Sequence, residues 1–131
     1  MLGWLGQVIN ASSPSLAVRL GLDEPEADID PTFFVDGRGE AFWDTVTLWI
    51  LPVAGILLIF NSPWWAYFGL VGGGMYLYFA GRGIAVRLVM QRREIRIGKP
   101  ETLKVVYVFR TLWGLTAIVT IIMAVVALPL P

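Results

Sequence analysis

The chain contains no cysteine and no histidine among its 131 residues. Without cysteine it can form no disulfide, thiolate nucleophile, iron–sulfur cluster or Cys-type zinc site. Without histidine it has no imidazole to ligate haem or to act as a catalytic base near neutral pH. We therefore expect no catalytic residue, no metal site and no tightly ligated cofactor, and we expect that the protein is not an enzyme.

Charge is also scarce in this chain. Only 15% of the residues are charged, 56% are hydrophobic, and the mean hydropathy is +0.69. A soluble domain usually carries about a quarter charged residues. The composition therefore predicts an integral membrane protein.

The formal net charge of zero hides a separation along the chain. Residues 1–44 hold eight acids and two bases, a balance of −6, whereas residues 82–110 hold eight bases and two acids, a balance of +6. Residues 45–81 and 111–131 carry no charge. These two uncharged blocks are the candidates for burial in a bilayer.

A membrane crossing needs about 20 apolar helical residues, so the first block can hold two helices and the second block one. Asn61, Ser62 and Pro63 divide the first block, and such residues are typical of a turn followed by a helix start. The sequence therefore predicts an all-α integral membrane protein with a helical hairpin and a third span. The three transmembrane helices are expected at 41–60, 63–87 and 105–128. The helix that contains the third span is expected to begin near Pro100, since proline suits a first helical turn.

The remaining segments are expected on one side of the membrane. Residues 1–40 form an acidic N-terminal arm with a short interfacial helix from Pro14 to Leu22, and Asp36 to Gly39 are expected to make a tight turn. Residues 88–104 form a basic connection that the arm can dock against. The excess of Arg and Lys makes this face cytoplasmic and puts the C-terminus on the opposite side. A bacterial inner membrane or an equivalent energy-transducing membrane is the expected location.

Aromatic residues stand near the ends of the expected spans. Trp43 lies at the cytoplasmic end of the first helix, and Trp64 and Trp65 lie at the far end of the hairpin. Because amphipathic rings favour the headgroup level, we interpret these residues as interface anchors rather than as a ligand cage.

Small residues follow one face of the second expected helix. Gly69 and Gly73 are four residues apart, and Ala80 roughly continues their face. Such a face lets another helix backbone approach closely. The sequence leaves open whether this contact forms within one chain or between chains.

Charged residues at the edges of the spans are the remaining candidates for a site. Arg110 lies several residues inside the third helix, and we expect Glu40 or Asp44 to pair with Arg110 or Arg82 near the cytoplasmic headgroups. The alternatives are that both arginines bind lipid phosphate, or that they contact a substrate or quinone. Arg92 and Arg93 are expected to contact anionic lipid or a partner protein, and nucleic acid is not an expected partner.

These features favour a role that depends on contacts. The leading hypothesis is a non-catalytic accessory or anchoring subunit of a larger membrane protein complex, such as a respiratory or photosynthetic electron-transfer complex. Any lipid, quinone or pigment would be held by packing and by contacts with Trp, Tyr or Arg. The alternative is a self-oligomerising membrane protein, such as a holin-like pore former or a small transporter component.

Overall fold

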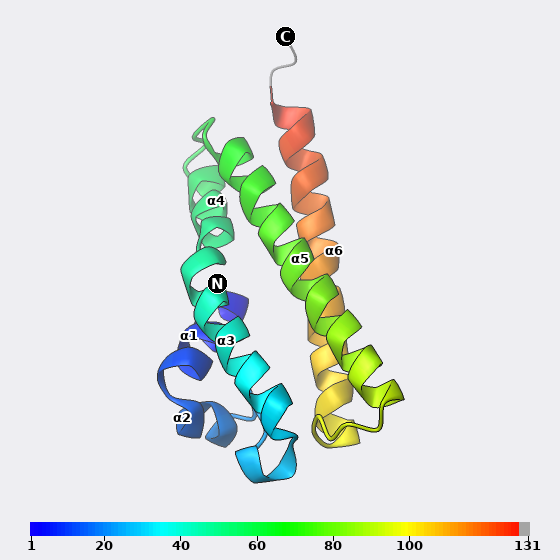
Figure 1. The fold of residues 1–131 in the computed structure, drawn as a ribbon. Coiled ribbons are helices and arrows are strands. Elements are labelled where there is room, and N and C mark those ends of the chain that lie inside the picture. The colour runs from blue at the N-terminus through cyan, green and yellow to red at the C-terminus, as the bar shows by residue number, and fades with distance from the viewer. Residues whose placement is uncertain (129–131) are drawn as a thin grey trace.

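The computed structural model describes residues 1–128 and is helical throughout, with no β-strand in that range. In chain order the elements are α1 (Leu2–Ser12), α2 (Pro14–Arg19), the 3-10 helix η1 (Glu26–Asp28), α3 (Pro31–Thr47), α4 (Ile50–Ile59), α5 (Trp65–Arg92) and α6 (Pro100–Ala127). Helices α3 to α6 build the body, and α1, α2 and the 3-10 helix form an N-terminal arm beside it (Figure 1).

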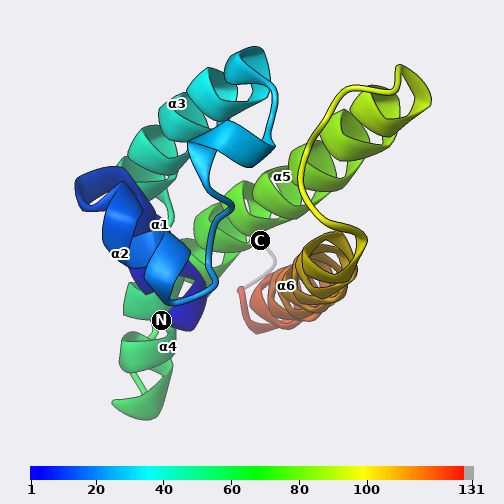
Figure 2. The same cartoon turned by 90° about the horizontal axis from the view of Figure 1, so that it is seen from below.

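The central helix of the body is α5. It packs along α6 on one side and against α4 on the other, while α1 packs on α3 (Figure 2). Two helical stretches, Pro31–Ile59 and Pro100–Ala127, are long and apolar enough to cross a membrane. The expected second span, α5, has the same length as α6, but many of its positions are glycine or tyrosine, which contribute little hydropathy.

The first expected span is divided and begins earlier than 41. Asp30 caps α3, with its side chain accepting a hydrogen bond from the Thr32 amide at 2.8 Å, so helix already covers the last ten residues of the predicted arm. Pro52 has no N–H to donate to the carbonyl four residues earlier, at Leu48, and α3 gives way to α4 at this point.

The tight turn predicted from Asp36 to Gly39 is absent, because these residues are helical within α3. Glycine lowers helix propensity by about 1 kcal/mol, but this weak local preference gives way to tertiary contacts. The contacts in question are those that Asp36 and Glu40 make from one face of α3, which are described below.

The other boundaries also differ in detail from the predicted ranges. The first helix of the hairpin ends at Ile59, and α5 starts at Trp65 rather than 63 and continues to Arg92, into the predicted connection. A segment of seven residues, 93–99, joins it to α6, which starts at Pro100 as expected, five residues before the predicted span. In the arm, α2 occupies part of the expected interfacial helix, whereas α1 had no counterpart in the prediction.

The small-residue face of α5 is used within the chain. A Cβ atom at Gly73 would lie 2.7 Å from Cγ1 of Ile121 on α6, and one at Gly69 would lie 3.4 Å from a methyl of Thr120. Gly72 accommodates α4 instead, since a Cβ there would lie 2.7 Å from the backbone nitrogen of Leu51. These glycines therefore let α4 and α6 approach α5 closely.

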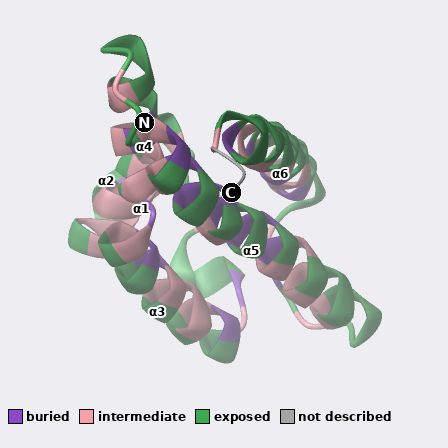
Figure 3. Cartoon of the chain, turned by 90° about the horizontal axis from the view of Figure 1, so that it is seen from above, coloured by how far each residue is buried: buried purple, intermediate pink, exposed green. Residues whose placement is uncertain are grey.

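Two apolar clusters hold the helices together. The first surrounds Tyr76 of α5, which packs edge-on against Phe79 and Trp113, and Trp4 of α1 joins it. The second joins Phe33 of α3 to Leu103 of α6. Figure 3 shows buried positions on the inward sides of the helices and exposed positions along their outer sides.

Candidate functional site: an arginine cluster beside an apolar groove

Three acidic residues of α3 are spaced four apart, at 36, 40 and 44, and therefore share one face of that helix. This face is turned toward arginines of α5 and α6. An Nη2 atom of Arg82 lies 2.7 Å from Oδ1 of Asp36, and its Nη1 atom lies 2.9 Å from Oε2 of Glu40. The other oxygen of Glu40 lies 2.9 Å from Nη1 of Arg110. Glu40 therefore bridges two arginines that come from different helices.

The Glu40–Arg110 pair is the buried part of this cluster. The two side chains are only 10% and 9% exposed. The Arg110 guanidinium also donates to the backbone carbonyl of Phe79 at 2.5 Å and lies 4.0 Å from the centre of the Phe79 ring. A buried guanidinium with this many partners is held in place by the protein, and it is not available to a lipid headgroup.

A glycine makes room for this arrangement. A Cβ atom at Gly83 of α5 would overlap the guanidinium of Arg110. The side chain of Arg110 therefore crosses α5 through a notch that only glycine leaves open, and it reaches Glu40 on α3. The sequence gives Gly83 no obvious role, because the notch exists only once α5 and α6 are packed.

Asp44 differs from its two neighbours on α3. It is 6% exposed, yet it makes no ion pair among residues 1–128, and its Oδ2 atom has no hydrogen-bond partner there. Of the two carboxylates proposed as partners for Arg82 or Arg110, Glu40 forms the contacts and Asp44 does not. The reason is position, because Glu40 lies one turn closer to the level of both guanidinium groups.

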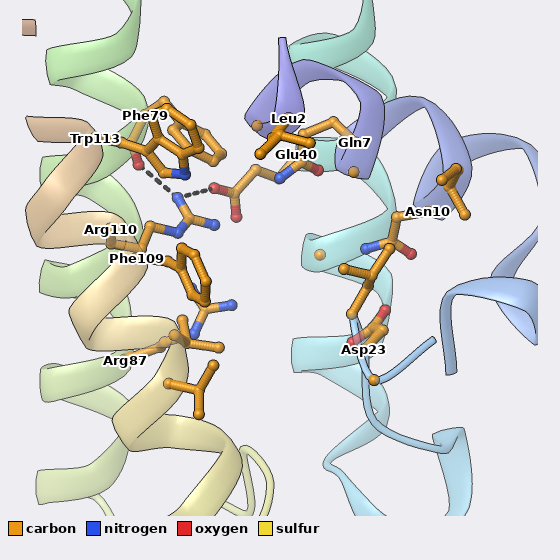
Figure 4. A pocket seen from close by; sticks show the side chains of 18 of the residues that line it. Leu2, Gln7, Asn10, Asp23, Glu40, Phe79, Arg87, Phe109, Arg110 and Trp113 are labelled. Carbon is orange, nitrogen blue, oxygen red and sulfur yellow. Dashed lines mark hydrogen bonds and ion pairs between the residues drawn. The ribbon is translucent and has the colours of Figure 1, made fainter. Parts of the chain in front are cut away.

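An apolar groove of about 520 Å³ opens beside the cluster (Figure 4). Helix α1 forms one wall with Leu2 and Leu5, and α6 forms the other with Phe109 and Trp113. Glu40 and Arg110 line it at one level, and Arg87 of α5 lines it at another. The groove thus combines apolar walls with a few polar groups, as ligand sites commonly do.

Arg87 is the cation of the groove that has no acidic partner. Its Nη1 atom donates to the carbonyl of Gly83 at 3.0 Å, and its guanidinium lies 5.3 Å from the centre of the Phe33 ring. Within residues 1–128 no carboxylate lies within 4.0 Å of it, in contrast to Arg82 and Arg110. The sequence alone did not distinguish Arg87 from the other bases of 82–110.

The acidic arm is attached to the body by polar contacts. The Arg38 guanidinium donates to the carbonyls of Asn10 and Ala11 at 2.6 and 3.2 Å. Glu24 accepts a hydrogen bond from the backbone N–H of Lys99 at 3.0 Å. The amide of Asp30 also donates to the carbonyl of Arg96 at 2.8 Å. The arm thus lies against the basic connection, largely through backbone groups.

The environment of Glu24 favours its ionised form. A hydrogen bond from the Thr102 side chain lowers the pKa of the Glu24 carboxyl below its ordinary value of 4.5, and the backbone hydrogen bond and charge of Lys99 act in the same direction. Partial burial acts in the opposite direction and does not cancel these effects. The carboxylate of Glu24 is therefore a specific contact between the arm and the start of α6.

The other predicted site residues lie at the ends of the bundle. Arg92 and Arg93 end α5 and are exposed. Trp43 and Trp64 are also largely exposed, at 61% and 63%, whereas the ring of Trp65 lies near Gly69. Ala80 is buried against α6 near Gly114.

Four threonine hydroxyl groups inside the expected spans bond to the backbone of their own helices. Thr45, Thr47, Thr116 and Thr120 each donate to the carbonyl four residues earlier, at 2.8 to 3.0 Å. No group of three or more acidic side chains within 1–128 is arranged to hold a metal ion.

Comparison of the chain with protein-family models, with curated proteins and with solved structures gave no match, so its function has to be argued from these contacts.

Proposed function

We propose that this chain is a small integral membrane subunit with three transmembrane helices, which packs against a larger membrane protein assembly and catalyses no reaction itself. The observation that carries the proposal is the outer face of α6. Large apolar side chains are exposed along nearly its whole length: Val105, Val108, Phe109, Leu112, Leu115, Ile118, Val119, Ile122, Met123, Val125 and Val126. An exposed apolar surface of this extent favours lipid or another protein over water.

The position of α5 supports a third crossing. It lies between α4 and α6, and its Gly69, Gly72 and Gly73 are covered by these neighbours. A helix that is shielded in this way needs less hydropathy of its own, because fewer of its residues meet lipid. Its basic end, with exposed Arg92 and Arg93, supports a cytoplasmic location for the arm and for the connection to α6.

The partner is proposed because three helices leave much of their own surface uncovered. Asp36 and Glu40 pair with Arg82 and Arg110 inside the body, whereas Phe42, Trp43 and Trp49 of the apolar stretch Pro31–Ile59 remain exposed. Surfaces of this kind serve helix packing in membranes, and the bases at the end of α5 suit anionic lipid. A respiratory or photosynthetic electron-transfer complex is the first class of partner to test, because the chain would contribute contacts to such a complex and no redox group.

Gentle solubilisation, native electrophoresis and mass spectrometry of the bands test the subunit proposal. We expect a stoichiometric larger partner. A homo-oligomer that makes liposomes leak ions would instead support the pore-forming alternative. The internal use of Gly69, Gly72 and Gly73 argues against that alternative, because it removes the best close-packing face from contacts between chains.

Topology can be tested by cysteine labelling, since the chain has no natural cysteine. Ser62→Cys should react with an impermeant maleimide from the outside of intact cells. Ser15→Cys, in α2, is the matched control and should react only after the membrane is opened. Reaction of both residues from the same side would contradict three crossings.

A further inference from the structure

The groove between α1 and α6 has a composition that restricts what can occupy it. Its walls are apolar side chains from two helices that make few contacts with each other, so a space of about 520 Å³ remains between them. Gly6 of α1 and Gly37 of α3 widen it, since a Cβ atom at either position would meet no atom within 4 Å. The lining is mostly apolar, which suits a hydrocarbon chain.

The charge in the groove points to a specific headgroup. Glu40 is shared between Arg82 and Arg110, and Asp36 also faces Arg82, so the acids of α3 that make ion pairs already have their cations. Arg87 remains, with a backbone carbonyl and an aromatic ring as its neighbours. In Figure 4 its guanidinium points into the groove, with Asp23 on the opposite wall. A planar guanidinium without a carboxylate partner is well suited to bind a phosphate with two parallel hydrogen bonds.

We infer that an anionic phospholipid occupies this groove, with its phosphate on Arg87 and an acyl chain between α1 and α6. The inference rests on the proposed membrane insertion, and it assigns a site distinct from the exposed bases Arg92 and Arg93. The lipid would fill the space between the arm and the body and would join them at the cytoplasmic side. It would therefore act as a structural lipid that holds α1 in place.

Native mass spectrometry of the full-length chain tests this inference. The protein is purified in a mild detergent, mixed with equal amounts of phosphatidylglycerol and phosphatidylcholine, and its bound lipids are counted. We expect one retained phosphatidylglycerol in the wild type. Arg87→Gln should weaken that binding roughly tenfold or more, as loss of a charged hydrogen bond would do. Arg19→Gln removes the same charge from an exposed position in α2 that does not line the groove, and it should leave the retained lipid unchanged.

A second pair of variants tests the position of the acyl chain. Gly6→Leu places a side chain in the groove and should displace the lipid, while Gly81→Leu, whose Cβ would also meet no atom within 4 Å, lies outside the groove and should not. Equal lipid loss in Arg87→Gln and Arg19→Gln would overturn the inference, and so would equal retention of phosphatidylcholine and phosphatidylglycerol by the wild type. Binding of inorganic phosphate as strongly as phosphatidylglycerol would also overturn it, because the acyl chain would then contribute nothing. These outcomes are separate from the subunit proposal, which fails if no larger partner co-purifies.

Discussion

Replacing Glu40 with glutamine tests the central contact of this fold. Glu40 is the only residue within 1–128 whose carboxylate contacts two arginines, with its two oxygens each 2.9 Å from a guanidinium nitrogen. Neutralising it leaves Arg110 buried with the Phe79 carbonyl and ring as its remaining partners, and leaves Arg82 with Asp36. Removing one partner of a buried ion pair typically costs about 3–5 kcal/mol, because the other charge stays buried without compensation. We expect Glu40→Gln to lower the free energy of unfolding by about 3 kcal/mol, the lower end of that range, since Arg82 is partly exposed.

Reversible unfolding in mixed detergent micelles, followed by tryptophan fluorescence, measures this free energy. Glu26→Gln is the matched control, because Glu26 is exposed and makes no ion pair within residues 1–128. Asp44→Asn should also cost far less than Glu40→Gln, since Asp44 has no cation to release. In a double-mutant cycle, Arg110→Gln should cost much less in the Glu40→Gln background than in the wild type. Additive costs, or equal costs for Glu40→Gln and Asp44→Asn, would refute the proposed bridge.

Three further changes follow from the packing and from the arm. Gly72→Ala should destabilise the bundle by about 1–3 kcal/mol in the same unfolding assay, because the new methyl meets the backbone of α4, whereas Gly74→Ala, in open space, should be neutral or stabilising. Gly83→Ala should displace the Arg110 guanidinium that crosses α5, and it should lower the free energy of unfolding by as much as losing the Glu40–Arg110 pair does. This effect should largely disappear in the Glu40→Gln background. An undiminished effect there would contradict the role of Gly83 in making room for Arg110. The pKa of Glu24 is lowered in the folded protein, so its carboxylate stabilises the arm fully at pH values above 4.5. This stabilisation is lost as the pH falls through the lower pKa of the folded state. Peptic cleavage of the arm should therefore be faster in Glu24→Gln than in the wild type at pH 5.5, and the two rates should converge as the pH falls through the lowered pKa of Glu24; a constant ratio over this range would contradict this contact.

Helix content and several helix ends could be read from the sequence because they depend on local signals. The uncharged blocks mark apolar helices, Pro100 starts α6 as its fit to a first helical turn predicts, and the hairpin turn falls at Asn61, which has a positive φ of 52°. The turn expected from Asp36 to Gly39 was wrong for a physical reason. Two glycines weaken a helix by only about 1 kcal/mol each, and the ion pairs of α3 with α5 and α6 outweigh that preference.

The site was predictable only in part. The position of Arg110 inside an apolar helix indicated that it needs a partner, and the acids at the start of the first span indicated where a partner could come from. The choice of Glu40 over Asp44 depends on the axial offset between α3 and α6, which no local pattern encodes. In the sequence, Arg87 resembles the other bases of 82–110. It becomes distinct only in the structure, because Asp36 and Glu40 form ion pairs with Arg82 and Arg110 and not with Arg87.

The sequence by itself determined the helical class, the two long apolar segments and the separation of acidic and basic charge, because each of these depends on composition over a window of residues. The tertiary structure decided where the small residues of α5 are used, which carboxylate bridges two arginines, and that a groove remains between α1 and α6 with one arginine unmatched. These properties depend on distances between helices far apart in the chain. Such distances are set by the simultaneous packing of all the helices, and for that reason they emerge only in the folded protein.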